Sequence, residues 1–186
     1  MKRTALLLCA LVSLSTAVLI VVIGGLPERA NYSEQMLPGE HPTAPEIDAI
    51  APPFEAPVLN GTRFDLVQLH GSPVIVNFWT TWCGPCRVEM PILQALYQQH
   101  QEQGLHILAV NLGENEAVVQ AWVVEMSLTF NVVLDEQQQI AGLYQLRGVP
   151  STYVLAPNGI ISEIFYGPIT ESQLQTAIAP YVSQPS

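Results

Sequence analysis

Residues 74–90 read VIVNFWTTWCGPCRVEM, and this stretch decides the fold. Its opening run, VIVNFW, is apolar and rich in β-branched residues, which is typical of a strand buried on both faces. A helix is predicted over residues 84–103, and it tolerates Pro85 because the N–H groups of a first helical turn have no partner within the helix. Cys83 and Cys86 thus stand where a buried strand passes into a helix.

A Cys-x-x-Cys pair at the start of a helix favours thiol chemistry. The unpaired N–H groups and the positive end of the helix dipole stabilise a thiolate on the first sulfur, that of Cys83. A structural disulfide would contribute little, because closing so short a loop removes little entropy from the unfolded chain. A zinc site would need further ligands, but the chain has no second such pair and its histidines are scattered: His41, His70, His100 and His106. The pair is therefore interpreted as a redox-active dithiol, and no metal or other cofactor is expected.

Beyond this stretch, strand and helix patterns alternate along the chain. The dipeptide Asn60-Gly61 between two short apolar segments predicts a β-hairpin. Further strands are expected over 105–110, 130–134, 152–155 and 160–166, and further helices over 115–127, 137–144 and 170–182. This order describes an α/β domain in which a central mixed sheet is flanked by helices.

The N-terminal region carries a membrane signal. Residues 5–26 hold no charge, and as a helix this run would span roughly 30 Å, the thickness of a bilayer core. Lys2 and Arg3 precede the run, so the bias of basic residues towards the cytoplasm places the rest of the chain outside. We expect residues 1–26 to be an uncleaved, single-pass anchor in the cell membrane, with a cleaved signal peptide as the alternative. Cys9 falls inside the run and is interpreted as an ordinary apolar residue of a membrane helix.

Charge and composition divide the remainder into two parts. Residues 27–51 are rich in proline and acids and show neither a strand nor a helix period, which predicts a flexible acidic linker. Residues 52–186 form the α/β domain. The whole chain has a net charge of −10 and contains no lysine beyond residue 26. Because neutralising phosphates needs rows of Lys and Arg, this balance excludes a nucleic-acid-binding function.

Two separate motifs resemble one known family. The segment FWTTWCGPC at 78–86 and the later GVPST at 148–152 are similar to proteins of the thioredoxin fold, and more narrowly to the membrane-anchored TlpA/ResA-type thiol-disulfide oxidoreductases. The resemblance extends to CRVEMP at 86–91, to the leader APPF at 51–54 with its hairpin, and to an inserted helix and strand within 115–134. It covers the whole predicted domain, and the anchor and linker fit the same group.

The resemblance implies a set of catalytic residues. Cys83 is the implied nucleophile and Cys86 the resolving thiol, and the pair alternates between a dithiol and a Cys83–Cys86 disulfide. Thioredoxins have a buried Asp two residues before the tryptophan of the preceding strand, and that position here is Asn77, which cannot titrate. Glu89 lies one helical turn after Cys86 and is the implied proton acceptor for it, with a pKa raised by burial. The alternative for Glu89 is an ordinary solvent-exposed acid on the helix.

The resemblance also implies a substrate-binding surface. Relatives have a cis peptide bond at the position of Val149–Pro150 and place it against the Cys-x-x-Cys pair. There the backbone of Val149 would pair with an extended substrate chain, and Trp82 would lie partly exposed beside the pair. A trans turn proline is the alternative for Pro150. Glu114 borders the site or, more simply, is an acid at a helix start.

The function implied by the resemblance is reduction of protein disulfides on the extracytoplasmic side of the membrane. The implied acceptor is the oxidised haem-attachment pair of apocytochrome c, and the implied electron donor is a membrane-embedded thiol transporter of the CcdA/DsbD type. Two alternatives remain. A copper-binding protein of the SCO type uses a CxxxC pair and a distant His, but no His follows His106. A thiol peroxidase of the alkyl hydroperoxide reductase type is matched superficially by Thr80-x-x-Cys83, without the proline that precedes its Thr.

Overall fold

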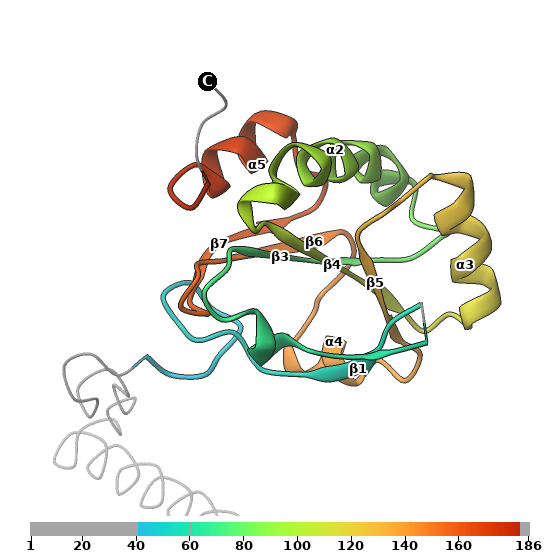
Figure 1. Ribbon diagram of the computed structural model, residues 1–186. Helices are drawn as coiled ribbons and strands as arrows, with labels where there is room; N and C mark the ends of the chain where they lie inside the picture. The colour runs from blue at the N-terminus through green and yellow to red at the C-terminus, as the bar shows by residue number, and fades with distance from the viewer. Residues whose placement is uncertain (1–40, 60, 183–186) are drawn as a thin grey trace, which may run out of the picture. The chain divides into compact units, whose positions relative to one another are not determined.

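The computed structural model describes residues 41–59 and 61–182. Their centre is a five-stranded sheet in the order β5-β4-β3-β6-β7, in which β3 runs parallel to β4 and antiparallel to β6 (Figure 1). The strands are β3 (Val74–Trp79), β4 (His106–Leu112), β5 (Asn131–Asp135), β6 (Ser151–Leu155) and β7 (Ile161–Tyr166). The predicted mixed α/β sheet is confirmed.

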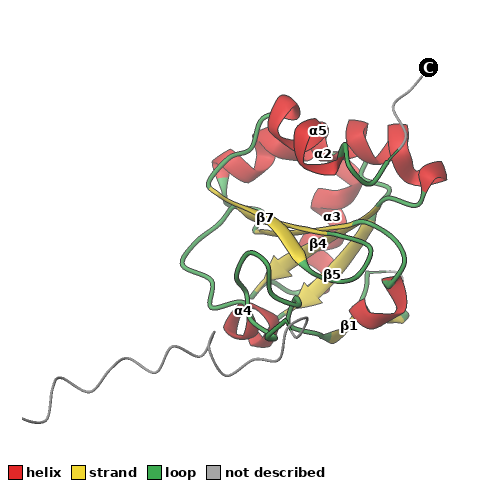
Figure 2. Cartoon of the chain, turned by 90° about the vertical axis from the view of Figure 1, so that its left-hand side faces the viewer, coloured by secondary structure: helices red, strands yellow, loops and turns green. Residues whose placement is uncertain are grey.

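Both faces of this sheet are covered. Helices α2, α3 and α5 pack on one face, and α4 together with an N-terminal hairpin packs on the other (Figures 1 and 2). The helices are α2 (Gly84–His100), α3 (Glu116–Glu125), α4 (Gln139–Leu143) and α5 (Glu171–Ile178), with short 3-10 turns at η2 (Leu66–Leu69) and η3 (Gln101–Gln103). The sheet therefore separates two hydrophobic cores.

Strand β3 contributes to both cores, because successive side chains of a strand point to opposite faces. Every residue of β3 is buried. Ile75 and Trp79 belong to the core beneath α2, whereas Val76 and Phe78 belong to the core on the side of α4. Asn77 shares the face of Ile75 and Trp79, so the strand presents one polar side chain towards α2.

The hairpin extends the fold at the edge of the sheet. Strands β1 (Glu55–Pro57) and β2 (Arg63–Asp65) pair antiparallel, and Gly61 in their turn has a φ of +83°, which glycine adopts without strain. Leu59 donates its N–H to the carbonyl of Val132 over 2.9 Å, which fastens the hairpin to the edge strand β5. The hairpin predicted from Asn60-Gly61 is confirmed.

The segment 42–51 packs onto the domain, although the sequence places it at the end of the linker. The N–H of Asp48 donates to the carbonyl of Ile161, and that of Ala51 to the carbonyl of Gly159, each over 2.9 Å. Ala49 and Ala51 are buried. The proline-rich composition of this segment does not predict these contacts, because their partners lie more than a hundred residues away in the chain. The folded domain therefore begins before residue 52.

No helix between residues 41 and 182 combines the length and the apolar character needed to cross a bilayer. The anchor predicted over residues 1–26, Cys9 within it, and the linker up to residue 40 lie outside the described residues.

Candidate active site

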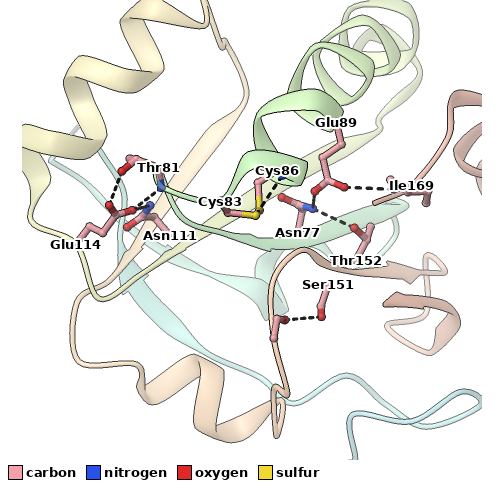
Figure 3. The surroundings of a disulfide bond; sticks show 11 residues. Asn77, Thr81, Cys83, Cys86, Glu89, Asn111, Glu114, Ser151, Thr152 and Ile169 are labelled. Carbon is pink, nitrogen blue, oxygen red and sulfur yellow. Dashed lines mark hydrogen bonds between the residues drawn. A yellow bond between two sulfur atoms is a disulfide. The ribbon is translucent and has the colours of Figure 1, made fainter. Parts of the chain in front are cut away.

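The two cysteines lie at the N-terminus of α2 and form a disulfide bond (Figure 3). Cys83 is the N-cap residue, and its Sγ accepts a hydrogen bond of 3.2 Å from the N–H of Cys86. Cys83 is 5% exposed, whereas Cys86 is 0% exposed, so Cys83 is the one that a partner can reach. The N–H groups and dipole at a helix N-terminus favour negative charge, so a thiolate on Cys83 is stabilised in the reduced protein.

Two tryptophans lie just before α2 in the chain, one exposed and one buried. Trp82, next to the disulfide in the chain, is 75% exposed and available to a partner. Trp79 is buried and stacks on Trp122 of α3, with ring centroids 4.4 Å apart. Arg87 lies over the same Trp122 ring, 5.9 Å from its centroid, and forms an ion pair with Glu125. The Arg87 contacts therefore join α2 to α3, whereas Trp79 is a core residue that packs α3 against β3.

Glu89 of α2 lies inside the protein, since it is only 1% exposed. Its carboxylate accepts hydrogen bonds from Asn77 Nδ2 at 2.7 Å and from the N–H of Ile169 at 3.4 Å (Figure 3). Burial raises the pKa of Glu89 from its ordinary value of 4.5 to about 7, because desolvation of the carboxylate outweighs these two hydrogen bonds. The carboxyl group therefore gains or loses a proton near neutral pH, one helical turn from Cys86.

Asn77 connects Glu89 to the sheet. Its Nδ2 donates to Glu89 and also to Thr152 Oγ1 at 3.0 Å, so this one amide joins β3, α2 and β6. Its Oδ1 is buried and has no hydrogen-bond partner among the described residues. The amide of Asn77 donates a hydrogen bond to the Glu89 carboxylate and, unlike an aspartate at this position, adds no second negative charge. The titratable acid of this site thus lies on the helix and not on the strand.

The peptide bond between Val149 and Pro150 is cis. Pro150 is buried just before β6 begins, and its carbonyl accepts a hydrogen bond of 2.9 Å from the N–H of Gly167. The Val149 side chain packs against the core that contains both cysteines. Within the described part of the chain, the N–H and carbonyl of Val149 have no hydrogen-bond partner. The hydrogen-bonding capacity of the Val149 backbone is thus not used inside the described domain.

Glu114 fastens the loop between β3 and α2. Its carboxylate accepts hydrogen bonds from the N–H of Thr81 at 2.7 Å, from Thr81 Oγ1 at 2.5 Å and from Asn111 Nδ2 at 2.7 Å (Figure 3). The cap of α3 is Asn115, so the simpler interpretation of Glu114 as a helix-start acid misses its role. The sequence contains one signal for this contact. Thr81 follows β3 and Glu114 follows β4, and the loops after two neighbouring parallel strands lie at the same edge of a sheet.

Comparison with known proteins identifies the family to which this chain belongs. The AhpC/TSA family matches residues 47–164. Over 133 residues the chain is 37% identical to the thiol-disulfide oxidoreductase ResA of Geobacillus thermodenitrificans, an alignment that covers 72% of this chain and 76% of that protein. The chain belongs to the ResA-type thiol-disulfide oxidoreductases. It is therefore an enzyme, and this favours thiol–disulfide exchange over the peroxidase and copper-binding alternatives.

Solved structures place this ResA-type enzyme in the thioredoxin-like fold. StoA from Bacillus subtilis superposes with a TM-score of 0.60 at 30% identity, covering 69% of this chain and 98% of StoA. A thiol:disulfide interchange protein of the thioredoxin family from Chlorobium tepidum superposes with a TM-score of 0.66 at 22% identity, covering 72% and 96% of the two chains. The predicted thioredoxin-like fold is confirmed.

Replacing Glu114 by alanine is expected to destabilise this ResA-type enzyme. The substitution leaves the N–H and hydroxyl of Thr81 and the amide of Asn111 without their charged acceptor, which costs about 2 kcal/mol in the free energy of unfolding. Denaturant unfolding of the oxidised protein measures this change. The matched control is Glu136→Ala, which removes an exposed acid that forms no ion pair with any residue the structure describes and should change stability by less than about 0.5 kcal/mol. Equal stabilities of the two variants would contradict the assigned role.

Proposed function

We propose that this ResA-type enzyme reduces protein disulfides outside the cytoplasm, held at the cell membrane by residues 1–26. The observation that carries the proposal is a disulfide at a helix N-terminus combined with the buried Glu89, whose pKa lies at about 7. A carboxylate with this pKa, close in sequence to the buried Cys86, suits proton transfer during thiol exchange at neutral pH.

The reaction begins at Cys83. Its thiolate attacks one sulfur of the substrate disulfide, and a mixed disulfide forms while the other substrate sulfur leaves as a thiolate. The N–H groups at the start of α2 stabilise this thiolate, and its slight exposure admits the substrate sulfur. The burial of Cys86 prevents it from competing for this first attack.

Cys86 completes the exchange. Its thiol passes a proton to the Glu89 carboxylate, and the resulting thiolate attacks the Cys83 sulfur. The bond between Cys83 and the substrate breaks, and the released substrate thiolate takes up a proton. Two electrons have then passed from the enzyme dithiol to the substrate, and the enzyme holds the Cys83–Cys86 disulfide.

The substrate is proposed to bind as an extended chain along the cis-proline loop. The open N–H and carbonyl of Val149 would form strand-like hydrogen bonds with it, Pro150 would leave room for its cysteine, and Trp82 would cover its apolar side chains. Such backbone pairing holds a cystine near Cys83 without requiring one particular sequence around it.

The direction of electron flow depends on the reduction potential. A Gly-Pro pair between the cysteines resembles reducing thioredoxin, with a potential of about −270 mV, more than oxidising DsbA at about −120 mV. We infer that a CcdA/DsbD-type membrane thiol transporter supplies the electrons. The proposed acceptor is the disulfide-bonded haem-attachment pair of apocytochrome c, which must be reduced before haem is attached.

Trapping the mixed disulfide tests this proposal. In Cys86→Ala the second attack cannot occur, so substrates should accumulate on Cys83 and be released by a reductant for identification by mass spectrometry. Apocytochrome c is expected among them, linked through its haem-attachment pair. The double variant Cys83→Ala/Cys86→Ala is the control and should capture nothing. Capture of other proteins alone would contradict the substrate assignment, and capture of no protein would contradict the reductase proposal itself.

A further inference from the structure

A cavity of about 500 Å³ opens beside the cis-proline loop. Its walls come from three segments: Pro45 and Glu46 of the N-terminal segment, residues between Tyr144 and Ser151 except Leu146, and the end of β7 at Tyr166 and Gly167. Val149 and Pro150 line this cavity, and Val149 also packs against the core that holds the cysteines. A polypeptide that pairs with the backbone of Val149 therefore lies against the cavity.

Arg147 is the cation of this cavity. The sequence from residue 41 to residue 182 contains 3 arginines and no lysine, against 13 acids. Arg63 pairs with Glu55 and Arg87 pairs with Glu125. Arg147 is exposed and forms neither an ion pair nor a hydrogen bond with any residue that the structure describes. A guanidinium group without a partner is suited to binding a carboxylate through two parallel hydrogen bonds.

Other groups at the cavity limit what it accepts. Glu46 lines the same cavity but does not form an ion pair with Arg147, so its charge opposes an acidic ligand while the guanidinium keeps its hydrogen-bond donors. The exposed ring of Tyr166 offers an apolar surface beside them. The excess of acids over the whole domain repels acidic proteins at long range, so any preference for an acid must arise by direct contact at this cavity.

We infer that this cavity is a side-chain subsite for the substrate polypeptide, and that Arg147 selects a substrate with an acidic residue close to its cystine. The inference rests on the proposed reduction of protein disulfides and adds the class of sequence that is preferred. Backbone pairing at Val149 supplies binding without regard to sequence, and the contact with Arg147 supplies discrimination.

Cystine-containing peptides test the inference. Each peptide carries one glutamate, moved stepwise along either side of the cystine, and its partner peptide carries lysine at the same position. The full-length chain, purified in detergent and kept reduced by a chemical reductant as electron donor, should show a higher kcat/KM for the glutamate peptide at one or more positions, by about threefold to tenfold. In Arg147→Gln this ratio should fall to one or below, and in Glu46→Gln it should rise because the opposing charge is removed.

The matched control is Arg63→Gln, which removes the same charge from the hairpin, far along the chain from the cis-proline loop. It should keep the wild-type ratio, so a change confined to Arg147→Gln cannot come from net charge alone. Circular dichroism and thermal unfolding check that each variant folds. A ratio that is equal to one in the wild type, or that survives in Arg147→Gln, overturns the inference. If the wild type reduces none of the peptides, the proposed function has failed instead, which is a distinguishable result.

Discussion

Replacing Cys83 by serine is expected to lower the rate of insulin reduction by the full-length chain by at least about 10³-fold. A serine hydroxyl is not ionised at neutral pH and cannot form a disulfide, so neither the mixed disulfide nor the enzyme disulfide is possible. The remaining thiol of the pair, Cys86, is fully buried and cannot take over the attack on the substrate. Turbidity from the precipitating insulin B chain, with a chemical reductant as electron donor, measures the rate.

The matched control for this result is Cys9→Ser, which removes a cysteine to which the mechanism assigns no part. It should retain the full rate of insulin reduction. Appreciable turnover by Cys83→Ser would contradict the assignment of Cys83 as the nucleophile. A comparable loss in Cys9→Ser would show that a third thiol takes part in the reaction.

Replacing Glu89 by glutamine is expected to change how stability depends on pH. Burial raises the folded-state pKa of Glu89 from 4.5 to about 7, so the folded protein binds this proton more tightly than the unfolded chain does. The resulting stabilisation is fully present below pH 4.5 and is lost as the pH rises to about 7. The loss amounts to about 3 kcal/mol, and it is absent in Glu89→Gln because an amide does not titrate.

Denaturant unfolding of the oxidised protein, below and above this pH window, measures the effect. The stability of Glu89→Gln relative to the wild type should rise with pH, while all other groups cancel in the comparison. The exposed acid Glu136, replaced by glutamine, is the control for removing a carboxylate from the surface. A pH-independent difference between Glu89→Gln and the wild type would mean that the carboxylate of Glu89 titrates in the folded protein as it does in water.

The same variant is expected to slow turnover by about 10²-fold, because Cys86 loses the proton acceptor that we propose for it. The pH–rate profile should also lose the ionisation near pH 7 that belongs to Glu89. A structural role alone would not remove this ionisation. An unchanged profile would therefore demote Glu89 from proton acceptor to a buried structural acid.

The start of α2 could be predicted from the sequence because its signals are local. The apolar run of β3, the cysteine pair and Pro85 lie within a few residues of one another, and together they fix where the strand ends and the helix begins. The inward position of Glu89 is different. Spacing along the helix places it on the face of Cys86, but one of its hydrogen-bond donors is the N–H of Ile169, eighty residues further along the chain.

Features that depend on distant parts of the chain were harder to predict. The contact between Glu114 and Thr81 requires knowing that β3 and β4 are parallel neighbours. The packing of residues 42–51 requires knowing that β7 lies at a free edge of the sheet, where it accepts another segment. Local composition cannot encode either fact, and the prolines of that segment suggest a linker when they are considered alone.

The attachment of residues 42–51 has a mechanical consequence. Tension that arrives from the N-terminal side of the chain first loads the hydrogen bonds that close this segment on itself, from the N–H of Ile50 to the carbonyl of Pro42 and from the N–H of Ala44 to the carbonyl of Ile50. The hydrogen bonds of Asp48 and Ala51 to the start of β7 and to the turn before it are loaded next. Once these bonds break, Pro45 and Glu46 leave the cavity beside the cis-proline loop, because they form one of its walls.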